Sequence, residues 1–426
     1  MDLILRLLDH VLFYLLQEWL YVHEIAKLDS AVCSSQLREK FLHSLMDSTC
    51  PISLDFCVMD LNGYLAWILK RKVSVTALVL GNDHTITPSA RYIQRNPHIN
   101  HVTTIHLYLQ SQMPDKWLEA LFKTCVEVSD LVLSLHRSYN HSKLFSLISK
   151  YCFNLKTLHF HEISQGQQYY QQEEIVNMRD IVHHCPLMES FTADHLLVTP
   201  QDFTEICRTW KFFRVLDVDV SGAVSVEHIS TLIKNNCSSL QHLRVPHTLE
   251  GLTLCPDIAP CLSRIQVLKI HYENNCDCAN SMLLLSSCPL LRQLEMGVFE
   301  WTDAVLGALL MHPTLENVVL ILNTAATGET MLFPSTASVS ALRSLTLSMF
   351  HSITDTGLYI LLQRCPELTQ LCLRSCHELT ITGIVSALTF CPLLQSLMVG
   401  GPFVDRAGLA LAVQVRVPAL NLTVLP

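Results

Sequence analysis

The sequence predicts an α/β solenoid in which short parallel strands line a concave face and helices pack outside them. A pattern of the form C-P-x-L-x-x-L-x-L recurs along the chain, its copies lie at nearly constant spacing, and each copy is followed by apolar residues at helical intervals. Half of the 426 residues are hydrophobic and only 16% are charged. A fold that buries many leucines along a line accounts for this composition.

The clearest copies of the pattern are "CPLLRQLEM" from Cys288, "CPELTQLCL" from Cys365 and "CPLLQSLMV" from Cys391. Successive copies start 24 to 27 residues apart, with one interval of 33, when the first apolar residue of each copy is aligned. The aligned residues, called register residues below, are Val75, Val102, Val128, Leu155, Met188, Phe213, Leu240, Ile265, Leu291, Leu315, Leu342, Leu368 and Leu394. The long interval contains the glutamine-rich stretch 162–180, which we interpret as an insertion loop.

Each copy of the pattern predicts a strand, a turn and a helix. Leu371 and Leu373 are two residues apart, so in a strand both point to one face while Cys372 points to the other. The apolar residues that follow have helical spacing, and Gly357 or Gly383 lies just inside the helix start. No single unit can bury its apolar face alone, so the units must stack.

This pattern resembles the cysteine-containing subtype of leucine-rich repeats, whose unit of about 26 residues ends in Cys-Pro after the helix. The resemblance implies a leucine-rich-repeat horseshoe of about 13 repeats over residues 75–426, preceded by a capping half-repeat at 51–74 with a strand and a helix. Register cysteines are missing at Trp210, Leu262, Val339 and Val417, which departs from a regular array.

Residues 1–50 do not carry the repeat and predict a small bundle of about three helices. A predicted helix ends in Trp19 and Leu20, a short polar turn follows, and a second helix begins at Ile25 and is followed by a Val-Cys-Ser step. This order of features resembles a degenerate F-box. The sequence departs from that family at Leu8, which is followed by Asp9 where the family has Leu-Pro. The resemblance implies docking onto a Skp-type adaptor of a cullin-RING ubiquitin ligase. The implied adaptor-binding residues are Leu12, Leu16, Trp19, Leu20, Ile25 and Val32.

The combined resemblance implies a non-catalytic substrate-recognition subunit of a cullin-RING (SCF-type) ubiquitin ligase. The alternative is a structural or scaffolding leucine-rich-repeat protein whose first helices only cap the solenoid, since a solenoid needs such a cap for solubility.

Seventeen cysteines raise the question of metal binding or disulfides. Zinc sites use closely paired ligands, whereas Cys365 and Cys391 recur one repeat apart and Cys372 with Cys376 lacks a second close pair. The first twenty residues lack a signal peptide's basic start and small-residue cleavage site, and no apolar run is long enough to span a membrane. We therefore expect a cytoplasmic or nuclear protein with reduced, buried thiols rather than a disulfide framework.

The sequence shows no catalytic or cofactor motif. It has no G-x-S-x-G, no H-E-x-x-H and no glycine-rich phosphate loop, and its net charge of −9 is unlike the basic excess of nucleic-acid binders. We expect a protein that is not an enzyme, with no catalytic residue, metal or cofactor, and with protein partners rather than nucleic acid or membrane.

The concave face is where the sequence places the partner-binding residues. Side chains between the core-facing positions of each strand point to this face. They are mixed in charge in the middle of the array, where paired charges would set specificity. The candidates are Tyr108, His159, His161, Asp194, Asp217, Asp219, Arg244, Lys269, Glu295 and Arg374. The alternative is an ordinary solvated face.

Overall fold

A computed structural model of the chain describes most of the repeat region and three residues before it. The described residues are Lys27, Asp29, Glu39 and the ranges 53–56, 61–73, 75–81, 90–109, 114–136, 140–163, 174–220, 225–246, 258–271, 283, 285–297, 302–323, 326–331, 340–401, 408–410, 412–413 and 420–425. They belong to two compact units, Met1–Trp210 and Lys211–Pro426.

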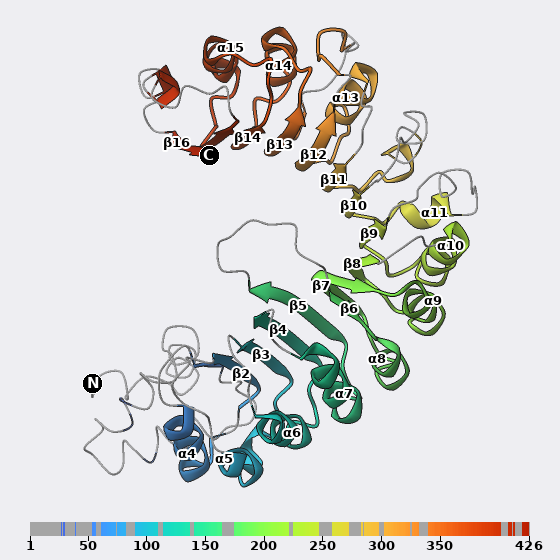
Figure 1. Ribbon diagram of the computed structural model, residues 1–426, viewed down its shortest axis with the longest axis vertical. Helices are drawn as coiled ribbons and strands as arrows, with labels where there is room; N and C mark the ends of the chain where they lie inside the picture. The colour runs from blue at the N-terminus through green and yellow to red at the C-terminus, as the bar shows by residue number, and fades with distance from the viewer. Residues whose placement is uncertain are drawn as a thin grey trace. The chain divides into compact units, whose positions relative to one another are not determined.

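The first unit alternates parallel strands with helices (Figure 1). Its strands are β1 (Ser53–Phe56), β2 (Ala77–Gly81), β3 (Thr104–Leu109), β4 (Asp130–His136), β5 (Thr157–Ile163), β6 (Glu174–Val176) and β7 (Ser190–Val198). Its helices are α4 (Leu61–Arg71), α5 (Ala90–Gln94), the 3-10 helix η2 (Pro97–Ile99), α6 (Asp115–Thr124), α7 (His141–Tyr151), α8 (Arg179–His184) and α9 (Pro200–Thr209). Neighbouring strands follow chain order from β1 to β5 and then β7, and β6, from the predicted insertion, pairs with β7.

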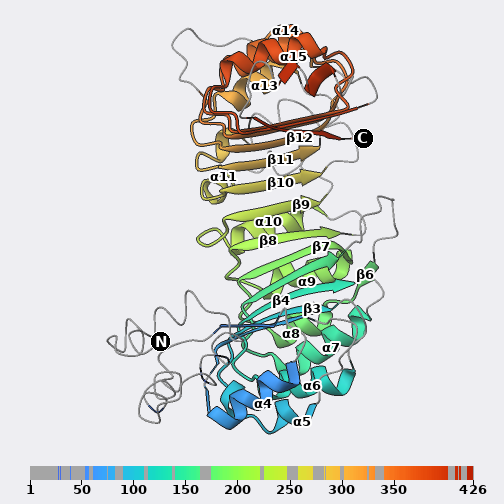
Figure 2. The same cartoon turned by 90° about the vertical axis from the view of Figure 1, so that its left-hand side faces the viewer.

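The second unit repeats this arrangement (Figure 2). Its strands are β8 (Val215–Val220), β9 (His242–Pro246), β10 (Val267–His271), β11 (Gln293–Gly297), β12 (Asn317–Asn323), β13 (Ser344–Phe350), β14 (Gln370–Arg374), β15 (Ser396–Gly400) and β16 (Asn421–Leu425). Its helices include α10 (Val226–Asn235), α11 (Ala259–Leu262), α13 (Asp303–Leu310), α14 (Asp355–Leu362), α15 (Ile381–Ala387) and the 3-10 helix η3 (Leu388–Phe390). Its described strands from β8 to β16 pair in parallel and in chain order.

In each unit the helices lie on one face of the sheet, and no described helix covers the other, which we call the open face (Figures 1 and 2). Leu371 and Leu373 of β14 are each 1% exposed on the helix side, whereas Cys372 between them is half-buried on the open face. All the register residues are buried, with exposed fractions from 0% to 7%. The structure confirms the predicted α/β solenoid of leucine-rich-repeat type.

The recurring cysteines lie where the helices end, and two of them donate hydrogen bonds to the backbone of the preceding repeat. Cys185 Sγ donates to the carbonyl of Cys152 (3.3 Å), and Cys391 Sγ donates to that of Cys365 (3.5 Å). Where the cysteine is replaced, the substitute makes an equivalent bond: Trp210 Nε1 donates to the Cys185 carbonyl (3.0 Å), and His312 Nε2 lies 3.1 Å from that of Cys288. Buried carbonyls need such partners, which explains why tryptophan and histidine can replace cysteine at this position in two repeats.

These helix-end thiols are inert at neutral pH. Burial raises the pKa of Cys288 and Cys365 to about 12 and that of Cys391 to about 11. A thiolate is the form that binds metals or attacks disulfides, so these side chains act as small buried donors. Among the described residues, no group of three or more histidine, cysteine or acidic side chains could hold a metal ion.

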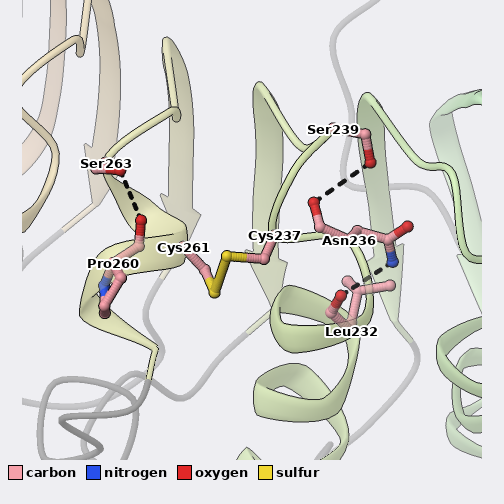
Figure 3. The surroundings of a disulfide bond; sticks show 7 residues. All are labelled: Leu232, Asn236, Cys237, Ser239, Pro260, Cys261 and Ser263. Carbon is pink, nitrogen blue, oxygen red and sulfur yellow. Dashed lines mark hydrogen bonds between the residues drawn. A yellow bond between two sulfur atoms is a disulfide. The ribbon is translucent and has the colours of Figure 1, made fainter.

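The expectation that all thiols are reduced is wrong for one pair, because Cys237 and Cys261 form a disulfide (Figure 3). The sequence alignment placed Cys237 at the helix end, but the structure places Asn236 there. Asn236 is fully buried, its backbone N–H donates to Leu232, and its Oδ1 accepts from the N–H of Phe213 in the preceding repeat (2.8 Å). One extra residue after the helix therefore moves Cys237 outward.

Helices of the last repeats begin with a Thr-x-x-Gly motif, as the sequence indicated. Thr354 and Thr380 are N-caps whose Oγ1 atoms accept from the N–H groups of Gly357 and Gly383 at 3.1 and 3.0 Å. Asp355, in the first turn of α14, also accepts from the N–H (2.8 Å) and the Oγ1 (2.6 Å) of Thr380 in the next repeat. A Cβ on Gly383 would lie 1.9 Å from the carboxyl carbon of Asp355, so this contact requires glycine.

The N-terminal segment contributes one described contact. Asp29 is 1% exposed, accepts a hydrogen bond from Trp67 Nε1 of α4 (3.1 Å) and pairs with Arg71 Nε (2.8 Å). The six predicted adaptor-binding residues lie outside the described residues. Within the part of the chain that the structure describes, every helix is too short or too polar to cross a membrane.

Candidate functional site

The candidate site is the open face of the two sheets, where alternate residues of each strand leave the core. In the first unit, Val79, His106, Val132, His159 and Thr192 occupy one row, each paired with its neighbour in the register of adjacent strands. Two residues further along, Tyr108, Ser134 and His161 form a second row. Because the strands pair in parallel, residues at the same position in successive repeats lie side by side and form rows across the open face.

The first unit presents an imidazole and phenol surface. The rings of His159 and His161 stack with centroids 6.5 Å apart and planes 7° apart, and His159 Nδ1 lies 2.5 Å from Thr192 Oγ1. Tyr108 is 39% exposed, large for an aromatic side chain on a sheet. Among the described open-face side chains of β3, β4 and β5, Asp130 is the one aspartate, glutamate, lysine or arginine.

The second unit presents a charged cluster centred on Asp217 of β8. Val215 pairs with His242 and Leu216 with Leu243, so the next open-face residues, Asp217 and Arg244, come together and form an ion pair. Lys269 of β10 is in register with Arg244, and its Nζ reaches Asp217 Oδ2 at 2.6 Å.

His242 completes this cluster, with Nε2 3.1 Å from Asp217 Oδ2. The carboxylate is only 4% exposed, whereas the side chains of Arg244, His242 and Lys269 are 12%, 20% and 24% exposed. The basic groups therefore face outward around a buried acid. Because the buried carboxylate contacts all three basic side chains, it holds side chains of β8, β9 and β10 in fixed positions relative to one another.

The environment of Asp217 keeps it ionised. Burial alone would raise the pKa of this carboxyl, but hydrogen bonds from His242 and Lys269 and the charges of Arg244 and Lys269 outweigh burial and hold the pKa well below its usual range. The acid at the centre of the cluster therefore stays charged across the physiological pH range.

The remaining predicted residues lie apart from this cluster. Glu295 of β11 is half-buried and in register with Lys269, and Arg374 of β14 is exposed and donates to Met398 Sδ of the next strand (3.3 Å). Asp194 and Asp219 lie in β7 and β8, and their side chains are outside the described part of the structure.

The sequence prediction missed His242 because it took the middle open-face position of each strand and the one two residues after it, and not the one two residues before it. The signal was available: His242 lies two residues before Arg244, so period-two alternation puts both on the same face. Asp217 was predicted as a surface charge, and the structure shows it nearly buried beneath its basic neighbours. The burial of Asp217 depends on how side chains from three strands pack together, which the sequence alone does not show.

A cavity of about 420 Å³ lies away from the open face, between the starts of α8 and α9. It is lined by Asn177, Arg179, Thr199, Gln201, Asp202 and Glu205. The carboxylate of Asp202 in α9 accepts a hydrogen bond from the backbone N–H of Met178 (3.2 Å), just before α8, so it links these two neighbouring repeats. This lining holds no nucleophile and base pair of the kind that catalysis requires.

No protein-family model matches the sequence, and no curated protein matches it. Among solved structures, the chain is similar to one in the crystal structure of the Rad7 and Elc1 complex from yeast, with 14% identity over 94% of this chain and 96% of that chain and a TM-score of 0.48. The others include an internalin, InlF, from Listeria monocytogenes (12% identity, 94% and 93% covered, TM-score 0.43) and the complex of TLR13 with ssRNA13 (14% identity, 80% and 58% covered, TM-score 0.38). At these TM-scores the likenesses carry no argument about function, and the fold assignment rests on the strand register and the buried register residues.

Proposed function

We propose that this protein is a non-catalytic protein-interaction subunit whose open face holds a protein substrate and whose first fifty residues attach it to a cullin-RING ubiquitin ligase of the SCF type through a Skp-type adaptor. The observation that carries the proposal is the open face, on which parallel strands present charged and aromatic side chains in fixed rows.

The side chains on this face suit a protein partner. Tyrosine and arginine are among the residues that supply most binding energy at protein interfaces, and Tyr108 and Arg374 are exposed here. The fixed charges of the Asp217 cluster favour partners with a complementary arrangement and disfavour others, which sets specificity more than affinity. A row of strands also offers an extended surface, as a folded partner requires.

Attachment to the ligase rests on the sequence of the first fifty residues. The apolar side chains proposed to dock on the adaptor are Leu12, Leu16, Trp19, Leu20, Ile25 and Val32. A subunit of this kind works in the cytosol or nucleus, which is the compartment we propose.

The alternative, a scaffolding protein whose first helices are only a cap, is favoured by one contact. Asp29 is buried against α4 through Trp67 and Arg71, so at least this residue of the N-terminal segment packs on the first repeats. A cap and a docking segment are compatible if other residues of the segment face outward.

Binding of a purified Skp-type adaptor to the full-length chain separates the two candidates. We expect the full-length protein to bind the adaptor, and a variant with Trp19→Ala and Leu20→Ala to lose binding at least tenfold while keeping its thermal unfolding midpoint. A matched control, Leu187→Ala, removes an exposed leucine (46% exposed) from the repeat region and should leave adaptor binding unchanged. If the full-length chain does not bind the adaptor, the ligase proposal fails and the scaffolding candidate stands.

A further inference from the structure

Cys237 stands apart from the other repeat cysteines because it has no place at the helix end. Asn236 takes that buried position and makes its bonds, through Nδ2 to the carbonyl of Leu232 (2.9 Å) and through Oδ1 to the N–H of Phe213 (2.8 Å). Cys237 follows it in the turn and is half-buried, whereas the helix-end cysteines Cys125, Cys152, Cys185, Cys288, Cys365 and Cys391 are buried. Cys237 therefore does not fill the buried helix-end position that the other repeat cysteines fill.

The partner cysteine belongs to the repeat with the shortest described α-helix. α11 has four residues, its N-cap Ile258 makes no side-chain capping bond, and Cys261 within it is 6% exposed. The bond from Cys261 to Cys237 ties this short helix to the end of α10, a full-length helix of the preceding repeat (Figure 3). The crosslink thus connects a four-residue helix to the end of the helix before it.

The crosslink lies just before the two strands that carry the basic groups of the Asp217 cluster. Cys237 precedes β9, with His242 and Arg244, and Cys261 precedes β10, with Lys269. Between them the backbone is joined by bonds from the N–H groups of Gln266 and Val267 to the Gln241 carbonyl at 2.7 and 3.1 Å. These bonds hold the strands in register whether or not the disulfide is present, so its loss would loosen the two repeats without unfolding the sheet.

We propose that Cys237 is an exchange site for low-molecular-weight thiols of the glutathione class, and that the Cys237–Cys261 bond is a reversible crosslink that sets the stability of the repeats carrying Arg244 and Lys269. Cys237 is the more accessible end of the bond, being half-buried where Cys261 is 6% exposed in α11, so an incoming thiol would attack the sulfur of Cys237.

The exchange balances in two steps. The thiolate of the small thiol attacks Sγ of Cys237, the sulfur–sulfur bond breaks, and the Cys261 thiolate leaves and takes a proton. The thiolate of a second small thiol then attacks the sulfur that the first small thiol contributed to the mixed disulfide, a small-molecule disulfide forms, and Cys237 leaves as a thiolate and takes a proton. The protein pair gains two electrons and two protons, and two molecules of the small thiol become one disulfide.

The test is a redox titration of the full-length protein in glutathione buffers, from fully oxidised to fully reduced, at pH 7.5. Exchange is stopped with acid, the chain is then unfolded in urea at neutral pH with N-ethylmaleimide present so that shielded thiols are labelled too, and each cysteine is quantified by peptide mass spectrometry. We expect Cys237 and Cys261 to be protected together in oxidised buffer and to become labelled with one common midpoint. Cys372, half-buried and free on the open face, is the control thiol and should show no such midpoint.

Two further measurements define the entry point and the consequence. The Cys261→Ser variant should accumulate a glutathione adduct on Cys237, and the Cys237→Ser variant should accumulate less than a tenth as much on Cys261. Hydrogen exchange of the wild-type protein should be faster on the order of tenfold in β9 and β10 after reduction, because a crosslink that closes a loop of this size stabilises by constraining the open state. Exchange in β3 and β4 should not change.

Three results would overturn the proposal. The first is full labelling of both cysteines after equilibration in oxidised buffer, which would mean that no bond forms. The second is a bond that survives excess reduced glutathione under native conditions, which would make it a permanent staple. The third is equal adduct formation on Cys261 and Cys237 or unchanged exchange in β9 and β10. The titration and the exchange measurement use the wild-type chain, so they hold even if a serine variant fails to fold.

Discussion

At the scale of single residues, the Asp217 cluster shows how a charge on a strand becomes part of the structure. The carboxylate is nearly buried, and its bonds to His242, Arg244 and Lys269 come from two neighbouring strands. Breaking a buried ion pair by removing one partner is costly, because the remaining charges lose their compensation. The cluster therefore orders this part of the open face as well as charging it.

Replacing Asp217→Asn should lower the free energy of unfolding at pH 7 by about 2–3 kcal/mol, since three basic groups lose their acid and the partial exposure of Arg244 and Lys269 reduces the full cost of a buried pair. Asp130→Asn, an acid on the open face of the first unit, is the control and should change stability by less than about 0.5 kcal/mol. Urea unfolding followed by circular dichroism measures both. A cost for Asp217→Asn no larger than the control's would contradict the structural role of the cluster.

The same variant should flatten the acid side of the stability profile. The pKa of Asp217 is lower in the folded protein than in the unfolded chain, so its contribution is complete above the unfolded pKa of about 3.9 and is lost as the pH falls toward the folded pKa. The difference between wild type and Asp217→Asn should not shrink from pH 7 to 5 and should shrink below about pH 4. A difference that shrinks already between pH 7 and 5 would assign the effect to another group.

At the scale of elements, the helix starts and ends explain why particular residues recur. Asp355 caps Thr380 of the next repeat and comes so close to Gly383 that no side chain fits there. At the other end, Cys185 is followed in the next repeat by Trp210, and the indole N–H bonds the carbonyl of Cys185. Hydrogen bonds between neighbouring repeats are thus made both at helix starts and at helix ends.

Replacing Gly383→Ala should cost about 1–3 kcal/mol, because the new methyl group must displace the carboxylate of Asp355 and its capping bonds. Asp355→Ala should cost about 1 kcal/mol as a lost cap, and the double variant should cost less than the sum, since the clash disappears with the carboxylate. Gly297→Ala, where an added Cβ meets nothing within 4 Å, is the control. Strict additivity in thermal or urea unfolding would show that the close approach is not what requires glycine.

Replacing Trp210→Phe should cost more than replacing Trp117→Phe, although both indoles are buried at 0% and 1% exposure. Trp210 Nε1 donates to a buried carbonyl, whereas Trp117 Nε1 has no hydrogen-bond partner, so only the first change leaves a carbonyl unsatisfied. The expected difference in the free energy of unfolding is about 1–2 kcal/mol. Equal costs by urea unfolding would mean that the helix-end bond contributes nothing to stability.

These elements also show what the sequence can and cannot predict. The apolar register was predictable, because a period of one repeat and an alternation of two residues are properties of the sequence itself, and all the register residues are buried. The place of Cys237 was not, since one extra residue after α10 puts Asn236 at the helix end, where its Oδ1 accepts from the N–H of Phe213 in the preceding repeat. Which open-face charges touch was equally hidden, because contact depends on reach across two strands, as Lys269 to Asp217 shows.

At the scale of the whole molecule, the two units share one construction and present different chemistry. The open face of the first carries stacked imidazoles and an exposed phenol, and that of the second carries a fixed charge cluster. On the other side of each sheet, the helices pack against the strands. We therefore expect partners to bind the open face, and we expect changes of exposed residues on the helix side to leave partner binding intact.

The most direct test of this account is quantitative affinity capture, read by mass spectrometry, with two matched triple variants of the full-length chain. One replaces the open-face residues Tyr108→Ala, His161→Ala and Arg374→Ala; the other replaces helix-side residues of the same types, Tyr92→Ala, His183→Ala and Arg91→Ala. Tyr108 and Tyr92 are 39% and 38% exposed, and the other four side chains are exposed, so the loss of surface is comparable.

We predict that the open-face variant loses the wild-type partners by on the order of tenfold or more while its unfolding midpoint is unchanged, and that the helix-side variant retains them. Retention of the partners by the open-face variant, or their loss from the helix-side variant alone, would contradict the claim that the open face is the binding surface.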